Sequence, residues 1–129
     1  MLLGLLPSCM IPVKYADVTD ESEYSSLVGR RYRLVRAMDI YGANAPPGYG
    51  KEIDFYVISR AEPGLGGRWL ISKDSLGPGT TLTVQRILQC CFGWTTIALV
   101  ALEPYAAAVD APIQFDLQYL TDAYVESVD

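Results

Sequence analysis

The chain has 129 residues, a formal net charge of −5 and no histidine. A mildly acidic chain lacks the clustered positive charge that phosphate groups require, which excludes nucleic acid as a partner. Without histidine, Ser-His and Cys-His nucleophilic sites and His-ligated metals are also excluded, so we expect no catalytic residue, no metal and no cofactor.

The length predicts a single domain with its own hydrophobic core. Eleven glycines and eight prolines indicate many turns and few long helices. Over residues 19–28 a short helical turn is expected, because Asp20 and Glu23 have the spacing of a capping box and Gly29 stands where a C-terminal glycine would end the turn.

The stretch 74–90 contains the strand around which the predicted fold is organised. A Gly-Pro-Gly turn at 77–79 leads into a strand in which Leu82 and Val84 alternate with polar residues. This period of two predicts one buried and one solvent-facing side. Further strands are expected at residues 30–41, 51–59, 69–72, 94–102 and 113–119, with the strand at 94–102 buried on both sides.

Arg36 interrupts the apolar face of the strand expected at 30–41. It either reaches past an end of the fold or pairs internally with a carboxylate such as Asp54. The nearby arginines Arg30, Arg31 and Arg33 serve either solubility or an anionic partner.

The pattern Leu-x-x-Gly-Thr-x-Leu-x-Val at residues 76–84 resembles SH3-like barrels, in which a Gly-Thr pair enters a strongly curved strand. This resemblance implies an all-β fold, a small antiparallel SH3-like barrel of five to six strands preceded by the short helical turn. Residues 29–129 would form this barrel domain.

Residues 1–9 resemble the end of a bacterial lipoprotein signal peptide, with Leu6, Ser8 and Cys9 in the positions of the lipobox. The resemblance implies a lipid attached to Cys9 and a periplasm-facing anchor in the cell envelope. Residues 1–28 would then be a signal remnant and a connector with the helical turn. The alternative is an apolar N-terminus with an incidental cysteine on a soluble cytoplasmic protein. Together, both motifs resemble bacterial envelope lipoproteins that carry an SH3-like domain.

SH3-like domains bind through aromatic side chains between their long loops, which implies a non-catalytic module for a peptide, a peptidoglycan fragment or a protein. The aromatic candidates are Tyr41, Tyr49, Tyr56, Trp69 and Trp94. Each of them could instead be a core residue. A second hypothesis is an inhibitory or structural protein that covers a partner. A third is a hydrolase without histidine that uses Asp39 and Asp54 on adjoining strands.

Cys90 and Cys91 are neighbours at the end of a predicted strand, so their side chains point to opposite faces and cannot join without strain. We expect either buried free thiols here or one of the two cysteines bonded elsewhere, rather than a vicinal redox switch.

Overall fold

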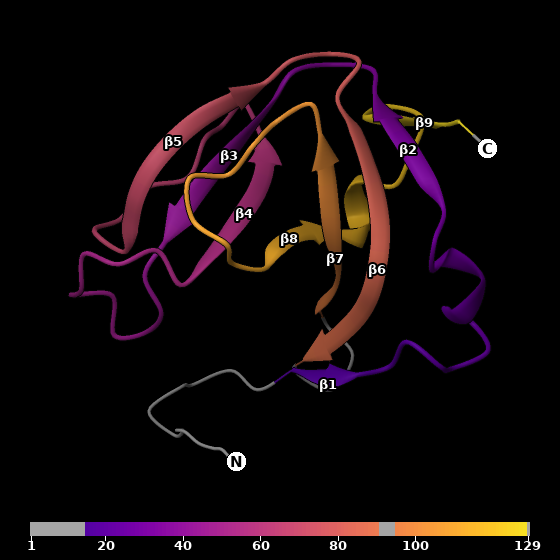
Figure 1. Cartoon of the computed structure of the whole chain (residues 1–129), viewed down its shortest axis with the longest axis horizontal. Helices are drawn as coiled ribbons and strands as arrows, with labels where there is room; N and C mark the ends of the chain where they lie inside the picture. Colours follow the sequence, from indigo (N-terminus) through magenta and orange to yellow (C-terminus); the bar gives the residue numbers. More distant parts are fainter. Residues whose placement is uncertain (1–14, 91–94, 129) are drawn as a thin grey trace.

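The computed structural model describes residues 15–90 and 95–128, and this part of the chain is all-β (Figure 1). The nine strands that it contains are β1 Ala16–Asp17, β2 Arg31–Leu34, β3 Met38–Ala43, β4 Phe55–Arg60, β5 Leu70–Leu76, β6 Thr81–Cys90, β7 Thr95–Glu103, β8 Ile113–Asp116 and β9 Val125–Ser127. The helical elements are two single 3₁₀ turns, η1 Ser25–Leu27 and η3 Leu117–Tyr119. No helix in the described residues has the length and hydrophobicity to cross a membrane.

All nine strands belong to one mixed sheet of the order β5-β3-β4-β8-β7-β6-β2-β9, with β1 added along β6. The β4–β8 pair is parallel, and the other pairs are antiparallel. The prediction of a small closed antiparallel barrel of five to six strands is therefore wrong, because this sheet is open, with β5 and β9 at its edges.

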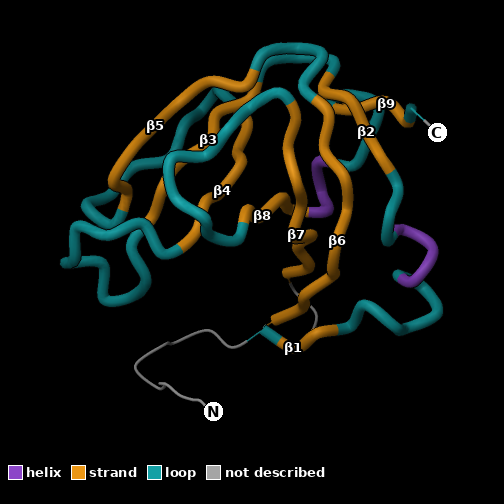
Figure 2. The backbone as a smooth tube through the Cα atoms, viewed as in Figure 1, coloured by secondary structure: helices purple, strands orange, loops and turns teal. Residues whose placement is uncertain are grey.

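The strand number rises because the predicted strand at 30–41 is interrupted by a bend and because β1 and β9 form in segments where no strand was predicted. The stretch 30–41 becomes β2 and β3, while the two strands predicted on either side of the Gly-Pro-Gly turn are observed as β5 and β6. Arg33 pairs with Thr81 before the bend and Met38 pairs with Leu76 after it, so the register continues across the corner. The sheet folds over at this corner, as the tube in Figure 2 shows.

The core lies between the two halves of the folded sheet. β3, β4 and β5 contribute Met38, Ile40, Tyr56, Ile58 and Leu76, while β6 and β7 contribute Leu82, Val84, Ile87, Ala98 and Val100. Phe115 on β8, where the halves join, is also fully buried.

The predicted turn and the alternation that follows it are confirmed. Gly79 has a φ of 94°, which glycine adopts without cost, and Leu82 and Val84 are buried. The alternation ends at a β-bulge: Val84 pairs with Val100 and Arg86 with Leu99, which leaves Gln85 as the extra residue.

Three other predictions need correction. Strand β7 is not buried on both sides, because Ala101 is exposed. Strand β8 ends at Asp116, whose carboxylate accepts a hydrogen bond from the Gln118 amide (3.0 Å) and caps η3. The turn η1 is present and Gly29 follows it with a φ of 85°, but its N-cap is Tyr24 and no capping box forms.

Candidate functional site

An apolar groove lies between the loop that follows β3, the outer face of β4 and the start of β5. Its volume is about 630 Å³ and its lining residues are Tyr15, Ala45, Pro46, Phe55, Val57, Leu65, Trp69 and Gln114. A smaller cavity of about 210 Å³ shares Pro46, Phe55 and Trp69 with it. We call the two together the Trp69 groove.

The floor of the groove follows from the alternation of β4. Tyr56 and Ile58 point into the core, so Phe55 and Val57 point to the opposite, outer face. Gln114 extends this floor, because Val57 and Gln114 are partners in the parallel β4–β8 ladder. Apolar residues therefore occur on both faces of β4, and the outer ones are only partly covered.

Trp69 is held in place although its side chain is half-buried. Its ring centroid lies 6.4 Å from that of Phe55, with an angle of 30° between the rings. A Cβ added at Gly48 would lie 2.8 Å from the Trp69 Cβ, and one added at Gly67 would lie 2.5 Å from the indole Nε1. Both glycines therefore permit a close approach that other residues would prevent.

A hydrogen-bond network around Asn44 fixes the loop that forms one wall. The Asn44 Nδ2 donates to the Glu52 carbonyl (2.9 Å) and to the Asp54 carboxylate (3.0 Å), and its Oδ1 accepts from the Gly50 amide (2.8 Å). Asp54 also accepts from the Ala45 amide (2.8 Å). The backbone of this loop is thus positioned before any ligand arrives.

The five predicted aromatic residues are not brought together. Trp69 lines the groove, whereas Tyr49 is 66% exposed outside it, with the Arg68 guanidinium 4.1 Å from its ring centroid. Tyr41 and Tyr56 are buried, and their hydroxyls accept hydrogen bonds from backbone amides. Trp94 lies outside the described residues, as does Cys9.

The carboxylates proposed for a hydrolase are also apart. Asp39 pairs with Ser59, whereas Asp54 precedes Phe55, which pairs with Ala43 at the other end of the β3–β4 ladder. At about 3.3 Å per residue, the two carboxylates stand more than roughly 10 Å apart along the sheet. The geometry therefore assembles no carboxylate pair from these residues.

Arg36 is exposed at the bend between β2 and β3, and its guanidinium lies 5.2 Å from the Tyr124 ring centroid. It does not pair with Asp54. Arg33, from the basic cluster, lies 3.6 Å from Glu126 of β9. Cys90 is a buried free thiol, as predicted, and Cys91 is outside the described residues.

The sequence-based candidates missed Phe55, Val57 and Leu65. The run Phe-Tyr-Val-Ile at residues 55–58 carried a signal for the first two, since it makes both faces of one strand apolar. Nothing in the sequence places Leu65 beside them.

The chain was compared with protein-family models, with curated proteins and with solved structures, and none of the three comparisons gave a match. Among the described residues, no group of three or more Cys, Asp or Glu side chains is placed to hold a metal ion.

Proposed function

We propose that this protein is a non-catalytic binding module of the cell envelope that holds an extended peptide segment in the Trp69 groove. The observation that carries the proposal is a half-exposed indole fixed over an apolar floor by Phe55 and two closely packed glycines. Rigid aromatic side chains of this kind supply most of the binding energy at many interfaces.

The lining of the groove favours a peptide. Its apolar surface suits aliphatic or aromatic side chains, while the Gln114 amide and the Trp69 indole N–H can meet backbone carbonyl and amide groups. Within the described part of the chain, no acceptor takes the indole N–H. Because the Asn44 network holds one wall in advance, little order has to be imposed when a ligand binds.

The proposed location is the cell envelope, with a lipid anchor at Cys9, and it is based on the lipobox resemblance. Tyr15 lines the groove and follows Cys9 by six residues. Six residues span at most roughly 20 Å, so a lipid on Cys9 would keep the groove close to the membrane surface. The ligand would then be a segment presented near that surface.

Selection from a displayed peptide library on the immobilised chain tests the proposed ligand class. We expect peptides with apolar side chains that lose about tenfold or more in affinity with Trp69→Ala and less than about twofold with the control Tyr49→Ala. Selected peptides that bind Trp69→Ala as well as the wild type would contradict the proposal. Trp69-dependent sedimentation with peptidoglycan, but no selected peptide, would replace the peptide by a wall fragment.

Mass spectrometry of the N-terminal peptide from a bacterial membrane fraction tests the proposed envelope location. A diacylglyceryl or triacyl adduct on Cys9 is expected. An unmodified Met1 in the soluble fraction would contradict the envelope location.

A further inference from the structure

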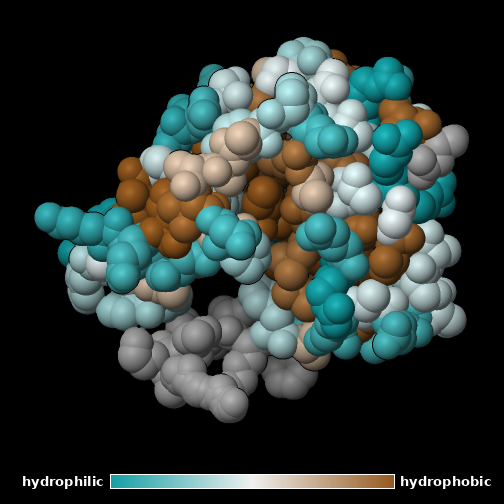
Figure 3. Space-filling model, in the orientation of Figure 1, coloured by the Kyte–Doolittle hydropathy of each residue, from teal (hydrophilic) through white to brown (hydrophobic). Residues whose placement is uncertain are grey.

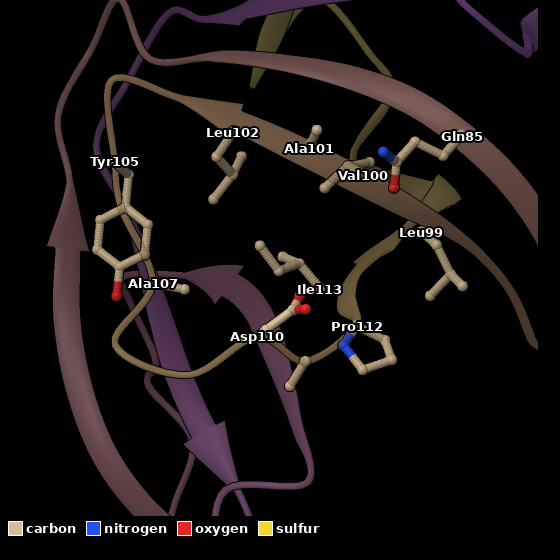
Figure 4. Close-up of a pocket in the computed structure, with 11 residues that line it drawn as sticks. Gln85, Leu99, Val100, Ala101, Leu102, Tyr105, Ala107, Asp110, Pro112 and Ile113 are labelled. Carbon is tan, nitrogen blue, oxygen red and sulfur yellow. The ribbon is translucent and has the colours of Figure 1, made fainter.

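A second cavity lies on the opposite face of β8 from the Trp69 groove. It has a volume of about 510 Å³, within the range of small-molecule sites, and lies between β7 and the loop of residues 104–112 (Figure 4). Ile113 lines this cavity while its neighbour Gln114 lines the groove, because successive side chains on a strand point to opposite faces. The space-filling view shows hydrophobic atoms in the hollow between this loop and β7 (Figure 3).

The loop that borders the cavity is held by Tyr56, which the sequence had offered as a ligand-binding residue. The Val109 amide donates to the buried Tyr56 hydroxyl (3.1 Å), and the Tyr56 amide donates to the Pro112 carbonyl (2.8 Å). The Tyr105 ring forms the far wall (Figure 4). The cavity is therefore built from a sheet face and an anchored loop.

Two polar side chains face this cavity without a partner in the described part of the chain. Asp110 is exposed and is the one charged side chain in the lining, and its carboxylate points toward Ile113 (Figure 4). Gln85 is the extra residue of the β6 bulge, and bulges redirect side chains; its amide lies on the other side, above Val100 (Figure 4). Between them the surface is apolar, with Leu99, Leu102 and Ile113.

We propose that this cavity binds a small organic cation, an amine carried on an apolar or aromatic body. The ammonium group would donate to the Asp110 carboxylate and the apolar lining would cover the body, while Gln85, on the other side, would accept a hydrogen bond only from a donor at the opposite end of the ligand. No lysine or arginine lines the cavity, and the net charge of −5 also favours a cation. Burial, and then the negative charge of Asp74, raise the pKa of Tyr105, so the Tyr105 hydroxyl stays neutral and adds no charge to the cavity wall.

Titrations of the full chain followed by ¹H–¹⁵N NMR test the proposal with three probes of one skeleton: phenethylamine, 2-phenylethanol and phenylacetate. We expect the amine to shift amide signals of β7 and the 104–112 loop, the alcohol to bind about tenfold more weakly, and the acid not to bind. Equal affinity for amine and alcohol, or amide shifts confined to the Trp69 groove, would overturn the proposal.

Two variants test whether the affinity for phenethylamine depends on the Asp110 carboxylate. Asp110→Asn keeps the shape of the side chain and should lower the affinity for phenethylamine about tenfold or more, whereas Asp122→Asn, an exposed acid outside the cavity, should leave it unchanged. An unchanged affinity in Asp110→Asn would refute the role of that residue. Failure of phenethylamine, tryptamine and cyclohexylamine to bind at millimolar concentration would refute the site.

Discussion

Gly67 packs directly against the indole of Trp69, so its replacement tests whether that side chain is held in place. Gly67 has a φ of 129°, and a Cβ there would lie 2.5 Å from the indole Nε1. We expect Gly67→Ala to strain the backbone and push the indole away from Phe55. Gly66 is an adjacent and equally exposed control, since a Cβ there meets nothing within 4 Å.

The expected loss of unfolding free energy in Gly67→Ala has a backbone part and a steric part. A non-glycine residue in this backbone region costs about 1–3 kcal/mol. The steric part adds little, because a half-buried indole can swing toward solvent once displaced. Gly67→Ala should therefore lower the free energy of unfolding by about 1–3 kcal/mol, while Gly66→Ala should change it by no more than about 0.5 kcal/mol.

Urea unfolding followed by circular dichroism measures this cost. A Trp94→Phe background leaves Trp69 as the single tryptophan, so its fluorescence emission reports the displacement separately. We expect a red shift of the emission in Gly67→Ala and no shift in Gly66→Ala. Equal stabilities and unchanged emission in both variants would refute the account of how the indole is fixed.

Three further predictions concern the core, the groove wall and the attachment of β1. Leu82→Ala should cost about 2–5 kcal/mol of unfolding free energy and Thr83→Ala well under 1 kcal/mol, and equal costs in denaturant titrations would mean that the β6 register is wrong. Asn44→Asp removes two donated hydrogen bonds and places a carboxylate beside Asp54, so it should cost about 2–4 kcal/mol by the same assay; a loss below about 0.5 kcal/mol would show that the network does not hold the loop. Hydrogen bonds from the Thr19 hydroxyl and amide, and then from Arg86, lower the pKa of Asp17 to about 2 from 3.8. Stability from this group is therefore present above pH 3.8 and lost toward pH 2, and solvent screening limits it to about 1 kcal/mol or less. As the pH rises from about 2 to 3.8, the unfolding free energy of the wild type should increase relative to that of Asp17→Asn. A difference between the two that does not change with pH would contradict this.

The sequence predicts local structure well where one face of a strand is buried. The Gly-Pro-Gly turn and the alternation of Leu82 and Val84 follow from steric preferences and from the period of two. The alternation fails at Gln85, because a bulge changes the phase and depends on the pairing with β7, which no local pattern specifies.

The sequence contains a signal for the bend of the sheet, but this signal has more than one interpretation. Arg36 interrupts the apolar face of the predicted strand at 30–41, and the structure bends there. An arginine at such a position is equally compatible with an internal ion pair, so the sequence alone does not identify the corner. The parallel pairing of β4 with β8 joins segments more than fifty residues apart, and it creates the floor of the groove.

The sequence identified Trp69 as a residue of the candidate site. It identified neither the residues that line the groove beside Trp69 nor the residues that hold its ring and the adjacent loop in place. Asn44 and Gly67 are typical loop residues in the sequence, and their roles depend on contacts that form only when two loops meet. Tyr41 and Tyr56 have the same side chain as the exposed Tyr49, and only burial distinguishes them.

The most direct test of the binding proposal is the indole N–H signal of Trp69 in a ¹H–¹⁵N spectrum of the Trp94→Phe variant, recorded while a selected peptide is added. The proposal predicts that this signal and the amide signals of Phe55 and Val57 shift together and saturate with the same affinity. A peptide that binds the protein while the indole signal stays unchanged would contradict it.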